Sequence, residues 1–490
     1  MFASFGYLSP FLAMALILYC LLSPIIVYLR DPLHLRRFPA PSLLAAITPL
    51  WLIHVTWLQN RSRTIHREIN RLGTEVIRVA PNHIIFNNPA PIKDIYGVLA
   101  ISRGVAKDEF YDRLARDAHD LVQFRDRGEH SDRRKAIANA FAAKTVVEME
   151  SVIRDKALQL VKKMDDLVNK ANTSGRKEAL NLRLWLNYFT LDVIGDTAFS
   201  DPMGFLERRS DATDAESQAA TSYRISSTID TLHRGWTLKT FCVRKLRRRL
   251  RNGALSRPSG DFMNFVLADR ISSAGKEEDE DKTAASDSEF RSLVADSVMM
   301  MNAGSDTTAA ALTSTILFLL QNPKALARLR EEVSPFAPPG EGGVFAYDDV
   351  KDLPSTSPVS IAGHSVLPGT VVAVAPYSIH KHPSLYRDPD AYVPERWIEA
   401  DSEFPNQQQD LKQYNIVFSQ GSRACIGRHL AIVELQILVP TLIARYNLQL
   451  GNLAADLEVK ERFNSNPGPM PVIVERRSAP QSSPLARASV

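Results

Sequence analysis

The segment Phe418–Gly427 carries Phe, Gly, Arg, Cys and Gly with the spacing F-x-x-G-x-R-x-C-x-G. Cys425 can bind a metal only as a thiolate, so its surroundings must stabilise a negatively charged sulfur. Gly421 and Gly427 permit a tight backbone approach that brings amide groups toward the sulfur, and a helical pattern beginning near Gly427 offers the positive end of its dipole. A buried structural cysteine is the alternative. The five positions together favour a metal-binding thiolate.

A second polar group interrupts an apolar helical pattern that runs from about residue 289 to residue 321. Gly304, Asp306, Thr307 and Thr308 lie in its middle. Glycine weakens a helix interior, and hydroxyl groups can bond the carbonyl four residues back, so we expect a local kink. An acid next to a hydroxyl can pass protons to a reacting group. The alternative is a tolerated glycine among ordinary buried hydroxyls.

A third pair lies in the segment Glu129–Phe141, where His130 and Arg134 are four residues apart. On a helix, this spacing places both side chains on one face, so they can bind one anion together. A solvated basic helix face is the alternative interpretation.

The three groups resemble motifs of the cytochrome P450 family, and they follow one another along the chain in the order expected for that family. The Cys425 segment is similar to the family's haem-ligand loop, and residues 302–308 are similar to its A-G-x-D-T-T oxygen-binding groove. Pro394–Trp397 resembles the P-E-R-W meander, and Leu191–Phe199 a helix that packs beside the oxygen-groove helix. The resemblance covers roughly residues 70 to 470. It implies a mainly α fold with a small β-sheet, preceded by a single transmembrane helix.

The resemblance also implies roles for individual residues. Cys425 would be the metal ligand, the fifth ligand of the iron of haem b. Asp306 would supply protons, Thr307 would orient the oxygen species, and Thr308 would support them. Arg134, in preference to Arg133, would contact a haem propionate. The positions expected to bind the cofactor are His130, Arg134, Gly304, Phe418, Gly421, Arg423 and Gly427.

One family motif is missing from the chain. No glutamate between Gly304 and Cys425 has an arginine three positions later, so the E-x-x-R helix cannot be found. We place the lost segment near residues 354–359. Arg396 of the meander would then lose its carboxylate partner, and unpairing a buried ion pair costs about 3 to 5 kcal/mol. A splice or gene-model error and a degenerate paralogue are competing explanations, and the intact remaining motifs favour the first.

The composition fits a membrane-anchored protein of the reducing cytosol. Residues 7–29 contain no charged side chain and are long enough to span a bilayer, and Arg30, Arg36 and Arg37 follow. We expect an uncleaved signal anchor, with a cleaved signal peptide as the lesser alternative. A second apolar stretch, residues 42–58, is expected to lie on the membrane or domain surface rather than to span. Three cysteines cannot form a disulfide framework.

The expected organisation is an anchor (1–30), a hinge with a membrane-surface segment (31–58), one haem domain (59–476) and a disordered tail (477–490). A net charge of +4 over 490 residues argues against nucleic-acid binding. The basic run of residues 244–251 is either a solvated helix face or a contact for anionic lipid or an acidic redox partner.

These features predict a haem-thiolate monooxygenase of the endoplasmic reticulum membrane, with its haem domain in the cytosol. It would insert one oxygen atom of O2 into a small apolar molecule, in a fungal secondary-metabolite branch that includes benzoate hydroxylases. Electrons would come from NADPH through a cytochrome P450 reductase, since the chain has no dinucleotide fingerprint. The alternatives are a non-catalytic P450-like membrane protein or a mis-spliced product with impaired haem binding, and an isomerase or dehydratase that keeps the haem.

Overall fold

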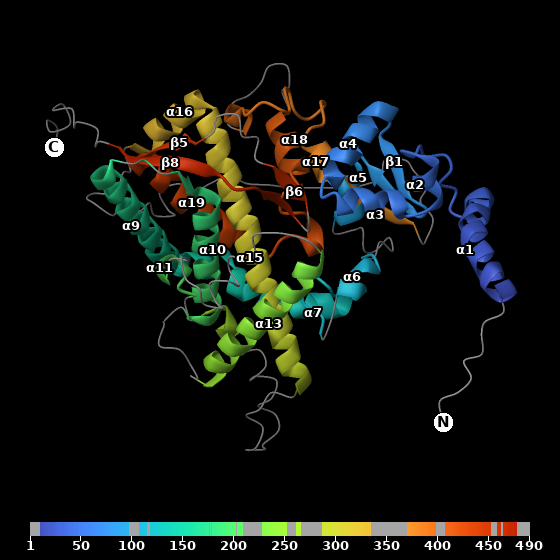
Figure 1. Cartoon of the computed structure of the whole chain (residues 1–490), viewed down its shortest axis with the longest axis horizontal. Helices are drawn as coiled ribbons and strands as arrows, with labels where there is room; N and C mark the ends of the chain where they lie inside the picture. The colour runs from blue at the N-terminus through green and yellow to red at the C-terminus, as the bar shows by residue number, and fades with distance from the viewer. Residues whose placement is uncertain are drawn as a thin grey trace. The chain divides into compact units, whose positions relative to one another are not determined.

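The structure is a computed structural model of the whole chain (Figure 1). It describes residues 10–97, 107–114, 118–175, 177, 179–201, 203–208, 228–251, 261–265, 287–334, 370–397, 407–451, 458–461 and 464–477. The sequence also predicts a loop between helices at the acidic residues 275–286. This loop, the lost segment near residues 354–359 and all but the first residue of the predicted tail lie outside the described residues.

The chain forms two compact units, each built from segments far apart in sequence. Unit 1 comprises Met1–Ala106, Pro354–Cys425 and Lys460–Asn464, and unit 2 comprises Lys107–Leu353, Ile426–Val459 and Ser465–Val490. The expected organisation into anchor, hinge, single haem domain and tail stays a prediction. The two units are described separately below.

Unit 1 is a small α/β unit around a three-stranded sheet with the order β1-β2-β4. β1 and β2 form an antiparallel hairpin, and β4 pairs with β2 in parallel. The helices and strands are α1 (Pro10–Arg30), α2 (Leu43–Ile47), α3 (Leu50–Trp57), α4 (Arg61–Leu72), β1 (Val76–Ala80), β2 (His83–Phe86), α5 (Pro91–Tyr96), β4 (Val371–Val374), α17 (Pro376–Ile379), η5 (Pro394–Trp397), α18 (Gln407–Tyr414) and η6 (Gly421–Arg423).

Apolar side chains on the sheet of unit 1 divide into two groups because successive residues of a strand point to opposite faces. Val76, Ile84 and Phe86 pack with Ile92 and Ile95 of α5. The alternate positions Ile77, Val79 and Ile85 pack with Ile65 and Ile69 of α4. The sheet thus has an apolar cluster on each side and supports the segments that follow β4.

Unit 2 is mainly helical. Its helices are α6 (Phe110–Leu114), α7 (Arg127–Ala138), η2 (Asn139–Phe141), α8 (Ala143–Glu148), α9 (Glu150–Ser174), α10 (Leu182–Phe199), α11 (Phe205–Arg208), α13 (Thr228–Arg251), α15 (Asp287–Gln321), α16 (Pro323–Val333) and α19 (Arg428–Arg445). Its strands are β3 (Leu180–Asn181), β5 (Tyr446–Leu450), β7 (Ser465–Pro467) and β8 (Pro471–Arg476), while β6 (Val459–Glu461) begins in unit 2 and ends in unit 1. β8 lies between β3 and β5, antiparallel to both.

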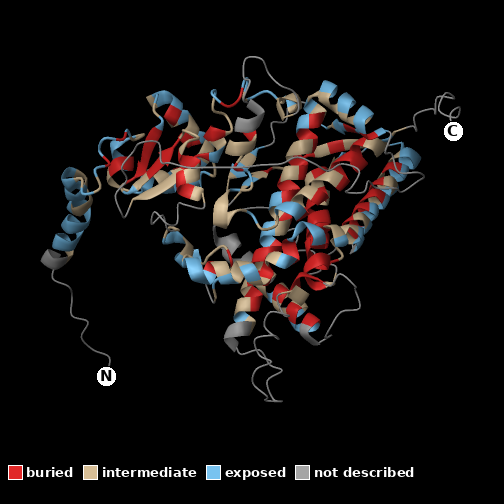
Figure 2. Cartoon of the chain, turned by 180° about the vertical axis from the view of Figure 1, so that it is seen from behind, coloured by how far each residue is buried: buried red, intermediate tan, exposed pale blue. Residues whose placement is uncertain are grey.

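The interior of unit 2 is organised around α10 and α15, which pack against each other (Figures 1 and 2). Every residue of α10 from Leu186 to Phe199 is buried, including the polar ones. A helix buried along this much of its length is surrounded by other elements, so its polar side chains need partners inside the protein. The packing confirms the prediction that the segment Leu191–Phe199 belongs to a helix beside the oxygen-groove helix.

The mainly α fold with small sheets is confirmed, and most predicted elements are present. The sequence of Glu75–Phe86 predicts two short strands around a turn, and these are β1 and β2. Residues 371–374 predict a further strand, which is β4. The helix expected from about residue 289 to 321 is α15. The apolar spacing of residues 131–170 predicts helix throughout, but the structure divides this stretch into α7, η2, α8 and α9, with breaks at Ala142 and Met149.

α1 contains the one helical stretch in the described part of the chain that is long and apolar enough to cross a membrane. This stretch, Ala13–Arg30, lies near the N-terminus and none of it is buried against the rest of the protein. It overlaps most of the span expected at residues 7–29.

Candidate active site

The cysteine loop is closed by a backbone hydrogen bond across its ends. In unit 1, the amide of Cys425 donates to the carbonyl oxygen of Phe418 at 2.8 Å. Between them η6 forms one tight turn, in which the Ala424 amide donates to the Gly421 carbonyl at 3.1 Å. The thiol of Cys425 is exposed and outside any disulfide. α19 begins three residues later at Arg428, with Gly427 as its N-cap, as the sequence predicted.

Gly421 is required by the fold of this loop. Its φ is +67°, a backbone conformation that disfavours side chains, and a Cβ here would lie 2.1 Å from the carbonyl oxygen of Tyr96. The close approach predicted for Gly421 is therefore made to the end of α5. Gly427 differs, because a Cβ added there would meet no atom within 4 Å. Its predicted cofactor role stays a prediction.

The polar turn of α15 has the hydroxyl geometry expected from sequence. Ser305 Oγ donates to the Met301 carbonyl at 2.7 Å, and Thr307 Oγ1 donates to the Ala303 carbonyl at 2.6 Å. α15 nevertheless continues as one α-helix from Asp287 to Gln321, without a break at Gly304. Thr307 is exposed, whereas Ser305 and Thr308 are buried. Thr307 thus lies on a face of α15 that the protein leaves open.

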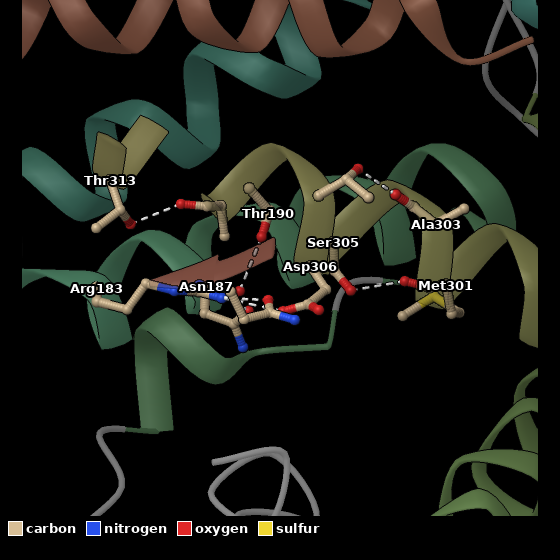
Figure 3. A network of polar contacts seen from close by, with 11 residues as sticks. Arg183, Asn187, Thr190, Met301, Ala303, Ser305, Asp306 and Thr313 are labelled. Carbon is tan, nitrogen blue, oxygen red and sulfur yellow. Dashed lines mark hydrogen bonds and ion pairs between the residues drawn. The ribbon is translucent and has the colours of Figure 1, made fainter. Parts of the chain in front are cut away.

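Asp306 forms an ion pair that the sequence did not reveal. Arg183 of α10 donates from Nη2 to Asp306 Oδ1 at 3.0 Å, and its guanidinium also reaches Asn187 Oδ1 at 3.4 Å (Figure 3). Both charged side chains are largely shielded from solvent. Burial lowers the pKa of Arg183, while the neighbouring Asp306 carboxylate opposes that shift. The pair fixes the Asp306 carboxylate on the side of α15 that faces α10.

Gly304 lies in the contact between α15 and α10. A Cβ at this position would lie 2.9 Å from both Cγ1 and Cδ1 of Ile194. The structure therefore gives Gly304 a role in helix packing that does not follow from its motif. Its predicted contact with a cofactor stays a prediction.

His130 and Arg134 lie one turn apart on α7, as predicted, and His130 is buried. The adjacent Arg133 is bound elsewhere: its Nη2 donates to Ser292 Oγ at 2.9 Å and pairs with the fully buried Asp296 of α15. Arg133 therefore connects α7 to α15. This arrangement fits the preference for Arg134 over Arg133 as an anion ligand.

The meander arginine has more partners than the missing motif led us to expect. Arg396 donates to the carbonyl oxygens of Val393, Arg387, Asp388 and Ala391 at 2.7 to 3.2 Å. Its guanidinium also lies 5.9 Å from the centre of the Tyr386 ring. The carbonyl groups of the meander itself thus satisfy the guanidinium donors. The loss of a carboxylate partner for Arg396 stays a prediction.

Comparison with known proteins identifies the family to which the chain belongs. The family model for cytochrome P450 matches residues 49–359 and 354–472, well over half of the chain. The chain belongs to the cytochrome P450 family. Members of this P450 family are haem enzymes, so the chain is identified as a P450 monooxygenase.

Related P450s of fungi match over nearly the full length. Benzoate 4-monooxygenase bphA of Aspergillus niger is 27% identical over 528 aligned positions, which include 96% of this chain and 98% of the relative. Cytochrome P450 monooxygenase ABA2 of Pyricularia oryzae is 26% identical over 88% of this chain and 87% of the relative. Among solved structures, the haem domain of cytochrome P450DA has a TM-score of 0.68 at 18% identity and covers 90% of this chain and 97% of its own, which supports the same fold.

The residues of this P450 fit a thiolate-bound haem. Cys425 presents an exposed thiol at the motif position. Burial raises the pKa of Cys242 to about 12, so that thiol stays neutral and is unsuited to bind iron. The third cysteine, Cys20, lies within α1. The donor chemistry therefore selects Cys425 among the three cysteines.

Proposed function

We propose that this P450 is a membrane-anchored monooxygenase that inserts one oxygen atom of O2 into a C–H bond or an alkene of a small apolar molecule. The observation that carries the proposal is the Cys425 loop within a chain of the P450 family. A role in fungal secondary metabolism is supported by the fungal relatives. One of these relatives is a benzoate 4-monooxygenase, which suggests an aromatic or similarly compact substrate.

In this proposal the residues singled out in the sequence would hold haem b. Cys425 would provide the thiolate ligand, and Arg134, Arg423 and His130 would bind the propionates. Phe418 covers the sulfur side of the loop. When bound, the haem supplies the oxygen-activating chemistry, which a thiolate ligand favours. The protein supplies the ligand, the orientation and the protons.

Asp306 and Thr307 are proposed to deliver those protons. The open position of Thr307 and the hydrogen bond from its hydroxyl to the Ala303 carbonyl leave its oxygen free to accept a proton or a hydrogen bond from the open side. Asp306 provides the acidic group one residue away. Its ion pair with Arg183 fixes the carboxylate in place.

Partners and location follow from the same proposal. α1 would anchor the protein in the endoplasmic reticulum membrane with the rest of the chain in the cytosol, which Arg30, Arg36 and Arg37 at its end support. NADPH–cytochrome P450 reductase would supply the electrons. The missing E-x-x-R motif is the observation that favours the second candidate, a P450-like protein with impaired haem binding.

The reduced carbon-monoxide difference spectrum tests the proposal. Haem-loaded protein should show the band diagnostic of thiolate ligation, and Cys425→Ala should abolish that band. Cys20→Ala is the matched control and should keep it. A haem-loaded wild-type protein without the band, or a band that persists in Cys425→Ala, would contradict the proposal.

The proton-delivery role has a separate test. Thr307→Ala should increase the hydrogen peroxide released per NADPH consumed, because oxygen is activated without orderly protonation. Thr313→Ala removes a hydroxyl that bonds the carbonyl four residues back in the same way, but from a buried position. It should leave the ratio unchanged. Equal ratios in Thr307→Ala and the wild type would rule out the role of Thr307.

A further inference from the structure

The segment that leads into the cysteine loop is anchored in the core of unit 1 at Ile416. This side chain is buried in an apolar cluster that also contains Ile379 and Tyr386. Directly after it the chain leaves the core, and Val417 is 67% exposed. Ile416 is the last buried residue before Cys425.

Both backbone polar groups of Ile416 form hydrogen bonds. Its amide donates to Nε2 of His380 at 3.3 Å, and its carbonyl accepts from the amide of Ser419 at 2.9 Å. Phe418, the residue before Ser419, accepts from the amide of Cys425 at 2.8 Å. Three hydrogen bonds thus connect the His380 ring to the backbone of the proposed ligand.

The turn that starts at Ile416 is strained. Ser419 has a φ of +57°, in the left-handed region that is unfavourable for a residue with a Cβ. A strained turn persists only where the surrounding contacts hold it. Gln420 supplies one such contact, because its Nε2 donates to the Gln413 carbonyl at 2.6 Å. The bond from Ile416 to His380 supplies another, to a distant part of the sequence.

His380 is itself fixed by backbone and side-chain contacts. It follows α17 directly, and its amide donates to the carbonyl of Pro376 at 2.9 Å. Just before this helix, the Ala375 amide donates to the carbonyl of Phe86 in β2 at 3.1 Å. The ring of Tyr386 contacts the His380 ring edge-on, with 6.3 Å between the ring centres. These contacts limit the directions in which Nε2 can point.

The His380 ring accepts a hydrogen bond only when it is neutral, because both nitrogens of a protonated ring are donors. Burial lowers the pKa of His380, so the ring is neutral at neutral pH. With Nε2 as the acceptor, the proton of the neutral ring is on Nδ1. A buried amide without an acceptor is unfavourable, so loss of the ring should displace the backbone at Ile416.

We propose that His380 is a positioning residue for the haem ligand, because its Nε2 holds the amide of Ile416 and so fixes the point at which the Cys425 loop leaves the core. Its effect passes through the backbone of the loop. The loop keeps its other contacts, so loss of the ring should loosen the position of Cys425 without unfolding unit 1. This inference rests on the proposed function, in which Cys425 provides the thiolate ligand.

Substitutions of His380 by glutamine and by asparagine form a matched pair. Glutamine can place an accepting oxygen near the position of Nε2, whereas asparagine reaches only the position of Nδ1. His380→Asn should therefore lose the bond from Ile416, and His380→Gln should retain it. His382→Phe is the control, because the His382 ring bonds locally to Ser384, with 2.7 Å between Nδ1 and Oγ.

Hydrogen–deuterium exchange measures the loop itself, in full-length proteins of equal haem content. In His380→Asn, peptides that contain residues 415–426 should exchange their protected amides about two- to tenfold faster than in the wild type, the factor expected for one lost hydrogen bond. His380→Gln and His382→Phe should exchange close to the wild-type rate.

The decay of the thiolate band of the reduced carbon-monoxide complex measures the ligand. During incubation at constant temperature, the band should decay several-fold faster in His380→Asn than in the wild type. His380→Gln should restore most of the wild-type lifetime, and His382→Phe should not change it.

The outcomes separate this inference from the proposed function. A haem-loaded wild type without the thiolate band contradicts the proposed function, and the positioning role falls with it. A wild type with the band, together with equal decay in His380→Asn and His380→Gln, contradicts the positioning role alone, and equal exchange in these two variants does so as well. Should His380→Asn not fold, the wild type still tests the bond, because an Ile416 amide that exchanges as fast as in an unfolded peptide contradicts it.

Discussion

Glu434 is a carboxyl group that α19 carries into the interior of unit 2. Its side chain is completely buried, and neither carboxylate oxygen has a hydrogen-bond partner among the described residues. Burial raises the pKa of Glu434 well above its ordinary value. The folded protein therefore holds a proton here that the unfolded chain releases at neutral pH.

This burial predicts a pH-dependent gain in stability for Glu434→Gln. Because the folded state binds the extra proton, the contribution of Glu434 becomes more destabilising as the pH rises from its unfolded pKa toward its raised folded pKa. The variant should be more stable than the wild type at pH 8, by on the order of 1 to 3 kcal/mol.

Thermal unfolding of both proteins in the same haem state, followed across pH, measures the difference. The gain should shrink as the pH falls toward the ordinary range of a glutamate and disappear there. A constant difference at all pH values would show that Glu434 is not the titrating group.

At this scale the sequence predicts chemistry better than contacts. Cys425 and Asp306 could be found from local spacing, because each belongs to a short motif. Arg183 could not, since it lies 123 residues before Asp306 and its own segment carries no signal for an ion pair. The spacing from His130 singles out Arg134 over its neighbour Arg133, but the ion pair of Arg133 with Asp296 has no signal in the sequence.

The contact between α10 and α15 leads to a prediction for Gly304. Alanine is better than glycine inside a helix by about 1 kcal/mol, so Gly304→Ala should stabilise an isolated α15. In the protein the added Cβ would meet Ile194 at 2.9 Å, and overpacking of this kind costs typically about 1 to 3 kcal/mol. Since α10 is buried along its length and has little room to move, we expect a net loss of stability.

A double-mutant cycle with Ile194→Ala identifies the cause. Ile194→Ala alone should destabilise the protein through the cavity it leaves. In a protein that already carries Gly304→Ala, Ile194→Ala should reduce the free energy of unfolding by less than it does in the wild type, because the new Cβ occupies part of the cavity. Chemical denaturation of the four proteins gives the coupling free energy. Additive effects would mean that Gly304 and Ile194 do not restrict each other.

Helices are predicted correctly where the apolar periodic pattern is long. The prediction is wrong where tertiary contacts determine the local structure. α15 and α19 could be read from their apolar spacing almost to the residue. The breaks at Ala142 and Met149 divide a continuous helical pattern, and no proline or glycine marks them in sequence. The hydrogen bonds from Arg396 to backbone carbonyl groups depend on the conformation of a loop. Apolar periodicity in the sequence does not predict that conformation.

At the scale of the molecule, the family pattern indicates a shortened chain. The P450 family model matches in two stretches that meet at residues 354–359, where we place the missing E-x-x-R segment. The alignment with the Aspergillus niger relative spans 528 positions, more than the 490 residues of this chain, so part of it faces gaps here. Neither observation locates a deletion, so the lost segment stays a prediction from the sequence. In the family this segment supplies a carboxylate to the meander arginine and side chains to the haem and the substrate.

Restoring the segment should therefore improve haem retention more than it stabilises the meander around Arg396. Arg396 already has four carbonyl partners, so a new carboxylate adds to bonds that exist instead of rescuing a bare charge. The propionate contacts, in contrast, rest on Arg134, Arg423 and His130 alone in the proposed site.

We predict that inserting the corresponding segment of the Aspergillus niger benzoate 4-monooxygenase after Pro354 raises the haem bound per protein several-fold. The ratio of haem absorbance to protein after gel filtration measures it, and a Gly/Ser insert of equal length is the control. Equal haem content in the two insertion variants would show that the missing segment does not limit haem binding, and would favour a lineage that has adapted to its loss.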